Sequence, residues 1–280
     1  MAQLGAHALG VPRDLVELVN ADTGQTPDSG VQGASRATYW VGNAVSGAAR
    51  TLRDNINGTV AELIDCDPAE LVISGKEIVS SQQPDKRMAL EAVASLFDEL
   101  EKPRKVAEFF DPSHLFPPET RPRYTPHFVT GAHLAEVLVD TQTGQVQVTR
   151  FVAVHDAGKV INLAGAEGQV EGAVLMGIGA ALKEEYLPNI TTGFRDYILP
   201  MVNEIPEIKT IFVEVPSYQG PLGAKGLGET AMLPSTPAVI NAISRAIGVR
   251  LRQIPATPER IIRQLIDLDQ SHTLGNRRVE

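Results

Sequence analysis

The sequence predicts an α+β fold, in which mixed sheets pack against helices, on three observations. Stretches with the two-residue period of a strand and stretches with helical spacing both occur, in no regular alternation. Turn residues join successive strand-like stretches directly at Gly75-Lys76 and at residues 140–145, which indicates antiparallel hairpins. No strand–GxGxxG–helix unit or Walker motif occurs, so a nucleotide-binding fold is not indicated.

The N-terminal stretch predicts a short helix, a short strand and a loop. Residues 1–9 look like the last turns of a helix that is broken at Gly10 and Pro12. Residues 14–19 alternate as a short strand would. After a loop rich in Gly, Pro, Asp, Ser and Thr, a long helical pattern starts at Thr38.

The following stretch predicts a hairpin between two helices. The helix that starts at Thr38 is expected to permit close packing or a break near Asn57-Gly58, because glycine weakens a helix. Residues 71–74 and 77–80 are the two strands of the first hairpin, and residues 88–100 form the next helix.

The C-terminal half continues the mixture of strands and helices. Strand-like patterns cover residues 128–139, 146–155 and 208–215. Helical patterns cover residues 168–182 and 230–247. A last helix is predicted to start with Thr257 as its N-cap and Pro258 in its first turn.

These elements predict two subdomains. Residues 1–111 form a first α+β subdomain that is incomplete at its N-terminus, and residues 112–126 form a proline-rich connector. Residues 127–268 form a second α+β subdomain, and residues 269–280 form a polar, frayed tail.

Composition excludes several classes of function. A formal net charge of -9 without a basic cluster argues against nucleic acid as a partner, because an acidic surface repels phosphates. The single cysteine, Cys66, cannot hold an iron–sulfur cluster or a disulfide by itself. The six histidines show no zinc-ligand spacing, so no direct protein ligand to a metal is expected. Neither a signal peptide nor a membrane-spanning run occurs, so we expect a soluble, cytoplasmic protein.

The glycine-rich loop GPLGAKGLGE at residues 220–229 is the first candidate for chemistry. Its glycines allow close approach to a ligand, and Glu229 is expected at the start of a helix, where the helix dipole favours a charged carboxylate. Such a carboxylate could serve as a general base. The alternative is that Glu229 only complements the positive end of the helix, which is the commoner role of an acidic residue there.

Two further segments combine glycines with polar residues. In the helix at 168–182, Gly168, Gly172 and Gly179 leave one side bare for a ligand, or for packing against another helix, which is the commoner role of such glycines. Gln169 and Glu171 are expected near its start, where they could contact a bound polar group. In the stretch TPDSGVQGASRATYW, the residues Gly33, Ala34 and Ser35 precede a helix and suit an anion such as phosphate, or else simply cap that helix.

In series, these segments resemble the molybdenum-binding subunit of the xanthine dehydrogenase / aldehyde oxidoreductase family. The resemblance rests on DTGQTPDSGVQGASRATYWVGNAV, VAVHDAGKVINLAGAEGQVEGAVLMGIG, DYILPMVNEIPEI and GPLGAKGLGETAMLPSTPAVINAI, and it runs from about residue 4 to about residue 267. It implies the C-terminal half of that subunit, with α+β subdomains wrapped around a molybdopterin cofactor, as such or as its cytosine dinucleotide.

The resemblance also implies roles for particular residues. Glu229 matches the glutamate that takes a proton from the oxygen nucleophile. Gln169 matches a pterin contact, and Gly33, Ala34 and Ser35 match the loop that approaches the metal and the pterin phosphate. The residues expected to shape the loop that presents Glu229 are Lys225, Gly226 and Gly228.

The front of the family's subunit has no counterpart in this sequence, which implies either a naturally split subunit, as in nicotinate dehydrogenase-like hydroxylases, or a truncation. The implied activity is hydroxylation of an aldehyde or of an N-heterocyclic or purine-like substrate with oxygen from water. The implied partners are the N-terminal half of the molybdenum subunit, a 2Fe-2S subunit and an FAD subunit. The alternative is a non-catalytic assembly or binding protein that retains the fold.

Overall fold

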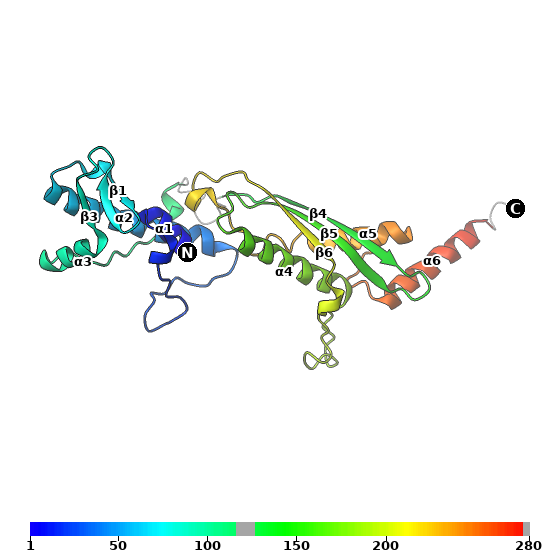
Figure 1. The fold of residues 1–280 in the computed structure, drawn as a ribbon. Helices are drawn as coiled ribbons and strands as arrows, with labels where there is room; N and C mark the ends of the chain where they lie inside the picture. Colours follow the sequence, from blue (N-terminus) through cyan, green and yellow to red (C-terminus); the bar gives the residue numbers. More distant parts are fainter. Residues whose placement is uncertain (116–126, 277–280) are drawn as a thin grey trace. The chain divides into compact units, whose positions relative to one another are not determined.

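The computed structural model describes residues 1–115 and 127–276, which divide into two compact units (Figure 1). Unit 1 comprises Met1–His127 and Pro216–Gly226, and unit 2 comprises Phe128–Val215 and Leu227–Glu280. Both contain helices and β-strands, which confirms the predicted α+β class. Of the predicted connector, residues 116–126 lie outside the described part of the chain.

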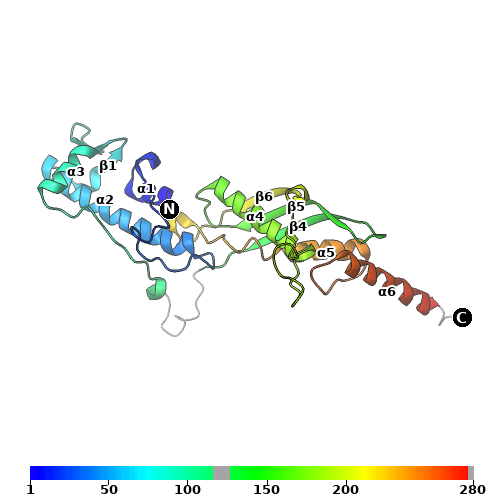
Figure 2. The same ribbon diagram turned by 90° about the horizontal axis from the view of Figure 1, so that it is seen from below.

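Unit 1 contains a helical pair and a small sheet with a helix packed against it. Its helices and strands are α1 (Ala2–Leu9), a π-helical turn (Ala37–Val41), α2 (Gly42–Ile64), β1 (Leu71–Ser74), β2 (Glu77–Ser80), β3 (Arg87–Ala89) and α3 (Leu90–Glu99). Short 3-10 turns cover Arg13–Leu15, Pro68–Glu70, Pro112–Leu115 and Pro221–Gly223. Figure 2 shows α1 beside α2, where Gly5 lies against Val45 and Gly42 lies against Leu4.

The hairpin predicted in unit 1 is confirmed residue for residue. β1 and β2 pair antiparallel from Leu71 opposite Ser80 to Ser74 opposite Glu77, and Gly75 adopts the left-handed conformation that the tight turn requires. A short third strand, β3, pairs antiparallel with β2. The core beside this sheet consists of Val60, Ala61, Leu71, Ile78, Val93 and Phe97.

Unit 2 is a three-stranded sheet with helices on one face. Its elements are β4 (Gly131–Val139), β5 (Val146–Asp156), α4 (Leu163–Leu182), a 3-10 turn (Val202–Glu204), β6 (Glu207–Val213), α5 (Ser235–Ile247) and α6 (Pro258–Asn276). β4 and β5 form the predicted antiparallel hairpin, whereas β6 pairs parallel with β5. The register of β4 and β5 shifts by one residue at a bulge between Glu136 and Val137.

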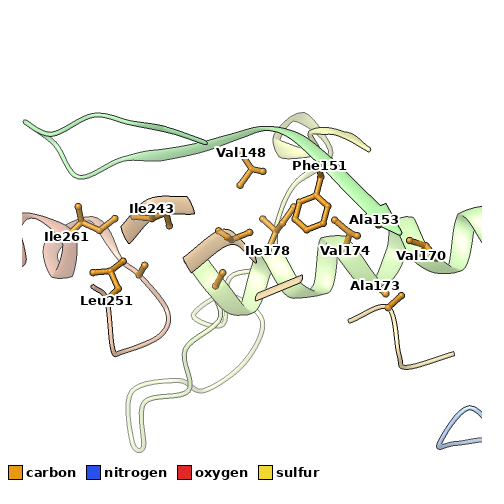
Figure 3. Packing of buried hydrophobic residues seen from close by; sticks show 14 of the residues in the cluster. Val148, Phe151, Ala153, Val170, Ala173, Val174, Ile178, Ile243, Leu251 and Ile261 are labelled. Carbon is orange, nitrogen blue, oxygen red and sulfur yellow. The ribbon is translucent and has the colours of Figure 1, made fainter. Parts of the chain in front are cut away.

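The core of unit 2 lies between this sheet and helices α4 and α5. Phe151 is fully buried and projects from β5 towards Val174 and Ile178 of α4 (Figure 3). Ile243 from α5 and Ile261 from α6 extend the same cluster. Apolar burial of this kind is the main term that stabilises such a layer.

Several predicted boundaries differ from the structure. The alternating stretch at 14–19 is not a strand, because Arg13–Leu15 forms a 3-10 turn and the chain that follows has no strand partner among the described residues. Helix α2 continues through Asn57-Gly58 to Ile64 without a break. The tail expected from residue 269 is helical as far as Asn276. Within the described ranges, no helix combines the length and the apolar character that crossing a membrane requires.

Candidate functional site

The loop before the π-helical turn holds two strained residues. Ala34 and Ser35 both have a positive φ, at 52° and 56°. Side chains disfavour this conformation, and such strain concentrates at functional sites when the surrounding structure holds it. The backbone N–H of Arg36 donates to the carbonyl of Gly33 at 3.3 Å, which closes a tight turn over this pair.

Unit 1 brings this loop against the glycine-rich loop, as the two candidate segments require. A Cβ atom added at Gly226 would lie 2.4 Å from the carbonyl oxygen of Ser35, so only glycine permits this approach. The N–H of Gly226 donates to Nε2 of His127 at 3.3 Å. The ring of His127 lies 4.9 Å from that of the buried Tyr39, whose hydroxyl donates to Gln219 at 3.0 Å. His127, Tyr39 and Gln219 therefore support the loop, although the sequence alone did not single them out.

Unit 2 brings Gln169 against the other end of the glycine-rich loop. Nε2 of Gln169 donates to the carbonyl oxygen of Gly228 at 2.7 Å. Glu229 follows directly and is exposed, and its backbone carbonyl oxygen accepts a hydrogen bond from the N–H of Met232 at 3.2 Å. The exposed carboxylate of Glu229 is thus attached to a turn that Gln169 holds in place.

Two predictions are wrong: neither Glu229 nor Gln169 lies at the start of a helix. α5 begins at Ser235, and residues 228–234 form successive turns, so Glu229 does not lie in the first turn of a helix. α4 begins at Leu163, where the side chain of Asn162 accepts from the N–H of Gly165. Gln169 therefore lies in the second turn rather than at the start. Asn162 is the capping signal in the sequence that marks this earlier helix start.

The glycines of α4 divide between the two roles proposed for them. A Cβ atom at Gly168 or Gly172 would have no described neighbour within 4 Å, so this side of the helix is open. A Cβ atom at Gly177 would lie 2.2 Å from Cβ of Ser235, and Gly179 lies against Glu184 and Pro200. Close packing therefore accounts for Gly177 and Gly179, so the expectation that Gly179 lies on the bare side is wrong, whereas Gly168 and Gly172 border Gln169 on an accessible face.

A pair of histidines in unit 2 was missed by the sequence analysis. Nε2 of His133 on β4 lies 2.7 Å from Nε2 of the buried His155 on β5. Burial lowers the pKa of both imidazoles, that of His133 to about 4. The hairpin turn alone would place the two side chains on opposite faces, and the one-residue bulge after Glu136 brings them to the same face. The bulge carries no clear sequence signal.

The candidate residues belong to both units. Gly33, Ala34, Ser35, Lys225 and Gly226 belong to unit 1, whereas Gln169, Gly228 and Glu229 belong to unit 2. Within unit 1, a strained loop at a helix start suits an anion, and within unit 2, an open glycine face lies beside a side-chain amide that can hydrogen-bond a ligand. Among the described residues, no group of three or more His, Cys, Asp or Glu side chains could hold a metal ion.

Comparison with known proteins assigns the chain to a family. The family model of the molybdopterin cofactor-binding domain matches residues 1–206, so the chain belongs to this family. The 6-hydroxypseudooxynicotine dehydrogenase complex subunit gamma of Paenarthrobacter nicotinovorans is 30% identical over 97% of this chain and 34% of its own length. The aldehyde oxidoreductase of Megalodesulfovibrio gigas is 28% identical over 92% of this chain and 26% of its own length.

Solved structures agree with this assignment. The crystal structure of quinoline 2-oxidoreductase from Pseudomonas putida 86 superimposes with a TM-score of 0.79 and 29% identity, covering 94% of this chain and 34% of that one. These findings confirm the resemblance to molybdenum subunits of the xanthine dehydrogenase and aldehyde oxidoreductase type. The chain spans about a third of the length of the curated relatives first matched.

Proposed function

We propose that this chain is part of the catalytic subunit of a molybdenum hydroxylase, which oxidises an aldehyde or an N-heterocyclic or purine-like substrate with oxygen from water. The observation that supports this most strongly is the contact between Gln169 and Gly228, which fixes the turn carrying the exposed carboxylate of Glu229. The rest of the subunit is about twice as long as this chain in the relatives, and we propose that it is required for activity.

In this proposal, bound molybdopterin, as such or as its cytosine dinucleotide, supplies a molybdenum centre that accepts two electrons from the substrate. Glu229 takes the proton from the oxygen nucleophile, which is the work of a general base. Gln169 donates one N–H of its side-chain amide to the carbonyl of Gly228. Its remaining N–H and its amide oxygen contact the pterin, beside the open face at Gly168 and Gly172. Gly33, Ala34 and Ser35 form the loop that approaches the metal and the pterin phosphate, and Lys225, Gly226 and Gly228 shape the loop that presents Glu229.

Electrons leave, in the same proposal, through a 2Fe-2S subunit and an FAD subunit; that two relatives are named as subunits supports the existence of partner chains. A cytoplasmic location also belongs to this proposal. A second candidate function, a non-catalytic assembly or binding protein, predicts the same fold without turnover, and the experiment below separates the two.

The test is to express the chain with its neighbouring reading frames, purify it by a tag on this chain alone, and measure bound molybdenum, pterin and turnover. Glu229→Gln should keep both metal and pterin and should lose turnover by about 100-fold to 10,000-fold, the usual contribution of a general base. Glu207→Gln removes another exposed carboxylate from unit 2 and should leave all three values unchanged.

Two results would contradict the proposal. If Glu229→Gln turned over at the wild-type rate with full cofactor, Glu229 would not be the base. If the chain purified alone, folded and without molybdenum, the catalytic assignment would fail and the binding or assembly function would take its place.

A further inference from the structure

The connection between helix α4 and strand β6, residues 183–206, exposes a cluster of large apolar side chains, and we call it the apolar loop. It projects from the body of unit 2 and is drawn in yellow-green in Figures 1 and 2. Its most exposed members are Phe194 and Val202, at 84% and 85%. The others that are more than half exposed are Tyr186, Ile190, Ile198 and Met201. Soluble monomers rarely expose apolar clusters of this kind, which mark surfaces that contact another chain.

Hydrogen bonds hold the tip of the apolar loop in a defined conformation. The carboxylate of Asp196 accepts from the backbone N–H and from the hydroxyl of Thr192, at 3.1 and 2.7 Å. The N–H groups of Asp196 and Tyr197 both donate to the carbonyl of Gly193 at 3.0 Å. Phe194 lies within this turn, so the turn fixes the backbone that presents its ring. A preformed tip loses little conformational entropy when it binds, which suits a docking element better than a flexible linker.

The apolar loop also presents one unpaired positive charge. At its base, Lys183 forms an ion pair with Glu204, and Glu185 forms one with Arg260 of α6. Arg195, at the tip, is exposed and has no ion-pair partner in the part of the chain that the structure describes. A surface that covers this tip should therefore be apolar and should place a carboxylate opposite Arg195.

We propose that the apolar loop docks into an apolar groove, with a carboxylate opposite Arg195, on the part of the molybdenum subunit that this chain does not contain. The relatives first matched are about three times as long as this chain, which favours this occupant over a second copy of the chain. The tip also has the composition of an interface centre, where aromatic and Arg side chains are enriched. The identity of the occupant rests on the proposed function, whereas the docking surface itself does not.

The test is a competition between the wild-type chain and a variant for the missing part of the subunit. Both full chains, with different tags, are expressed with the neighbouring reading frames, and the missing part is identified and quantified on each by its peptide masses. Phe194→Ser should retain at least about 10-fold less of it than wild type, because aromatic side chains at an interface centre dominate binding. Phe109→Ser is the matched control in unit 1, because Phe109 is 85% exposed, and it should compete as wild type does.

A second measurement locates the contact without weakening it. The photo-cross-linking residue p-benzoylphenylalanine at position 194, in the assembled complex, should form a covalent link to the missing part of the subunit. Circular dichroism should show that Phe194→Ser folds as wild type does, because this side chain is exposed.

Equal competition by Phe194→Ser and Phe109→Ser would overturn the docking proposal, and so would a cross-link that reaches only a second copy of this chain or no chain at all. If Phe194→Ser kept the missing part and its molybdenum in full, the docking surface alone would be wrong. If wild type held the missing part through position 194 but had neither molybdenum nor turnover, the docking surface would stand and the proposed function would fail.

Discussion

At the residue scale, the His133–His155 pair makes the stability of unit 2 depend on pH. Both rings are held neutral because burial disfavours their charged forms, and for His133 the neighbouring His155 adds to this effect. Protonating His133 would remove its acceptor nitrogen from the contact with His155, and protonating His155 would place a charge on a fully buried ring. The pair is therefore stable only while both rings stay neutral.

We expect the free energy of unfolding to fall as the pH is lowered from about 6.5 towards about 4. In that window the unfolded chain takes up protons at these histidines and the folded chain does not, so acid favours unfolding. The loss should be on the order of 2 kcal/mol, and urea unfolding between about pH 7 and about pH 5 measures most of it before carboxylates titrate. His133→Gln should remove much of this slope. An unchanged slope in that variant would contradict the assignment.

The residue scale also shows what a sequence can and cannot predict about the site. The types of residue in the candidate loops could be identified, because the glycines and polar side chains lie in recognisable local patterns. The close approach of Gly226 to Ser35 and the bond from Gln169 to Gly228 join segments far apart in the chain, so only the fold reveals them. The helix-dipole argument for Glu229 was wrong, because α5 starts later than the apolar pattern.

At the scale of elements, helix α4 has one packed end and one open face. The second half of α4 is buried. Gly177 permits its contact with α5, and Gly179 permits its contact with the segment that follows α4. Its first half exposes Gly168, Gln169 and Gly172. The helical pattern predicted the element itself, but apolar spacing could not distinguish an open glycine face from a packed one.

Substitution of these glycines should therefore have opposite effects on stability. Gly168→Ala should raise the free energy of unfolding by about 0.5–1 kcal/mol, because alanine favours a helix and meets no neighbour. It should also lower bound pterin in the purified assembly if the open face receives the cofactor. Gly177→Ala should lower stability by about 1–3 kcal/mol, because its Cβ would overlap Ser235. Thermal unfolding and pterin assay measure both effects, and a stabilising Gly177→Ala would refute the packing argument.

The strand order could be predicted from the sequence only where neighbouring strands are joined by a short turn. Both hairpins could be predicted because the turn residues specify which strands are neighbours. The parallel pairing of β6 with β5 could not, because the long connection through α4 leaves no turn signal. The predicted helix at 88–100 wrongly included part of the short strand β3, because three residues are too few to show the alternation of a strand.

At the scale of the whole molecule, each unit has its own hydrophobic core. Val60, Ile78 and Phe97 belong to one cluster, whereas Phe151 and Ile243 belong to the other. Separate cores predict that damage to one unit is felt first in that unit.

Ile78→Ala should destabilise unit 1 by about 2–5 kcal/mol, because it leaves a cavity at a fully buried position. Hydrogen exchange should then quicken in strands β1–β3 and helix α2, with little change in β4–β6. Ile243→Ala is the matched change in unit 2 and should give the reverse pattern. If either variant quickened exchange equally in both units, the two cores would behave as one cooperative block.

Because Pro216–Gly226 belongs to unit 1, neither unit is encoded by one continuous stretch of the gene. The chain crosses between the units three times, and the last crossing falls between Gly226 and Leu227, inside the loop that carries Glu229. A gene break or recombination at any single crossing would divide at least one unit between two polypeptides. Neither unit can therefore be exchanged for a relative's as one uninterrupted stretch of DNA, and we expect the two to have diverged together.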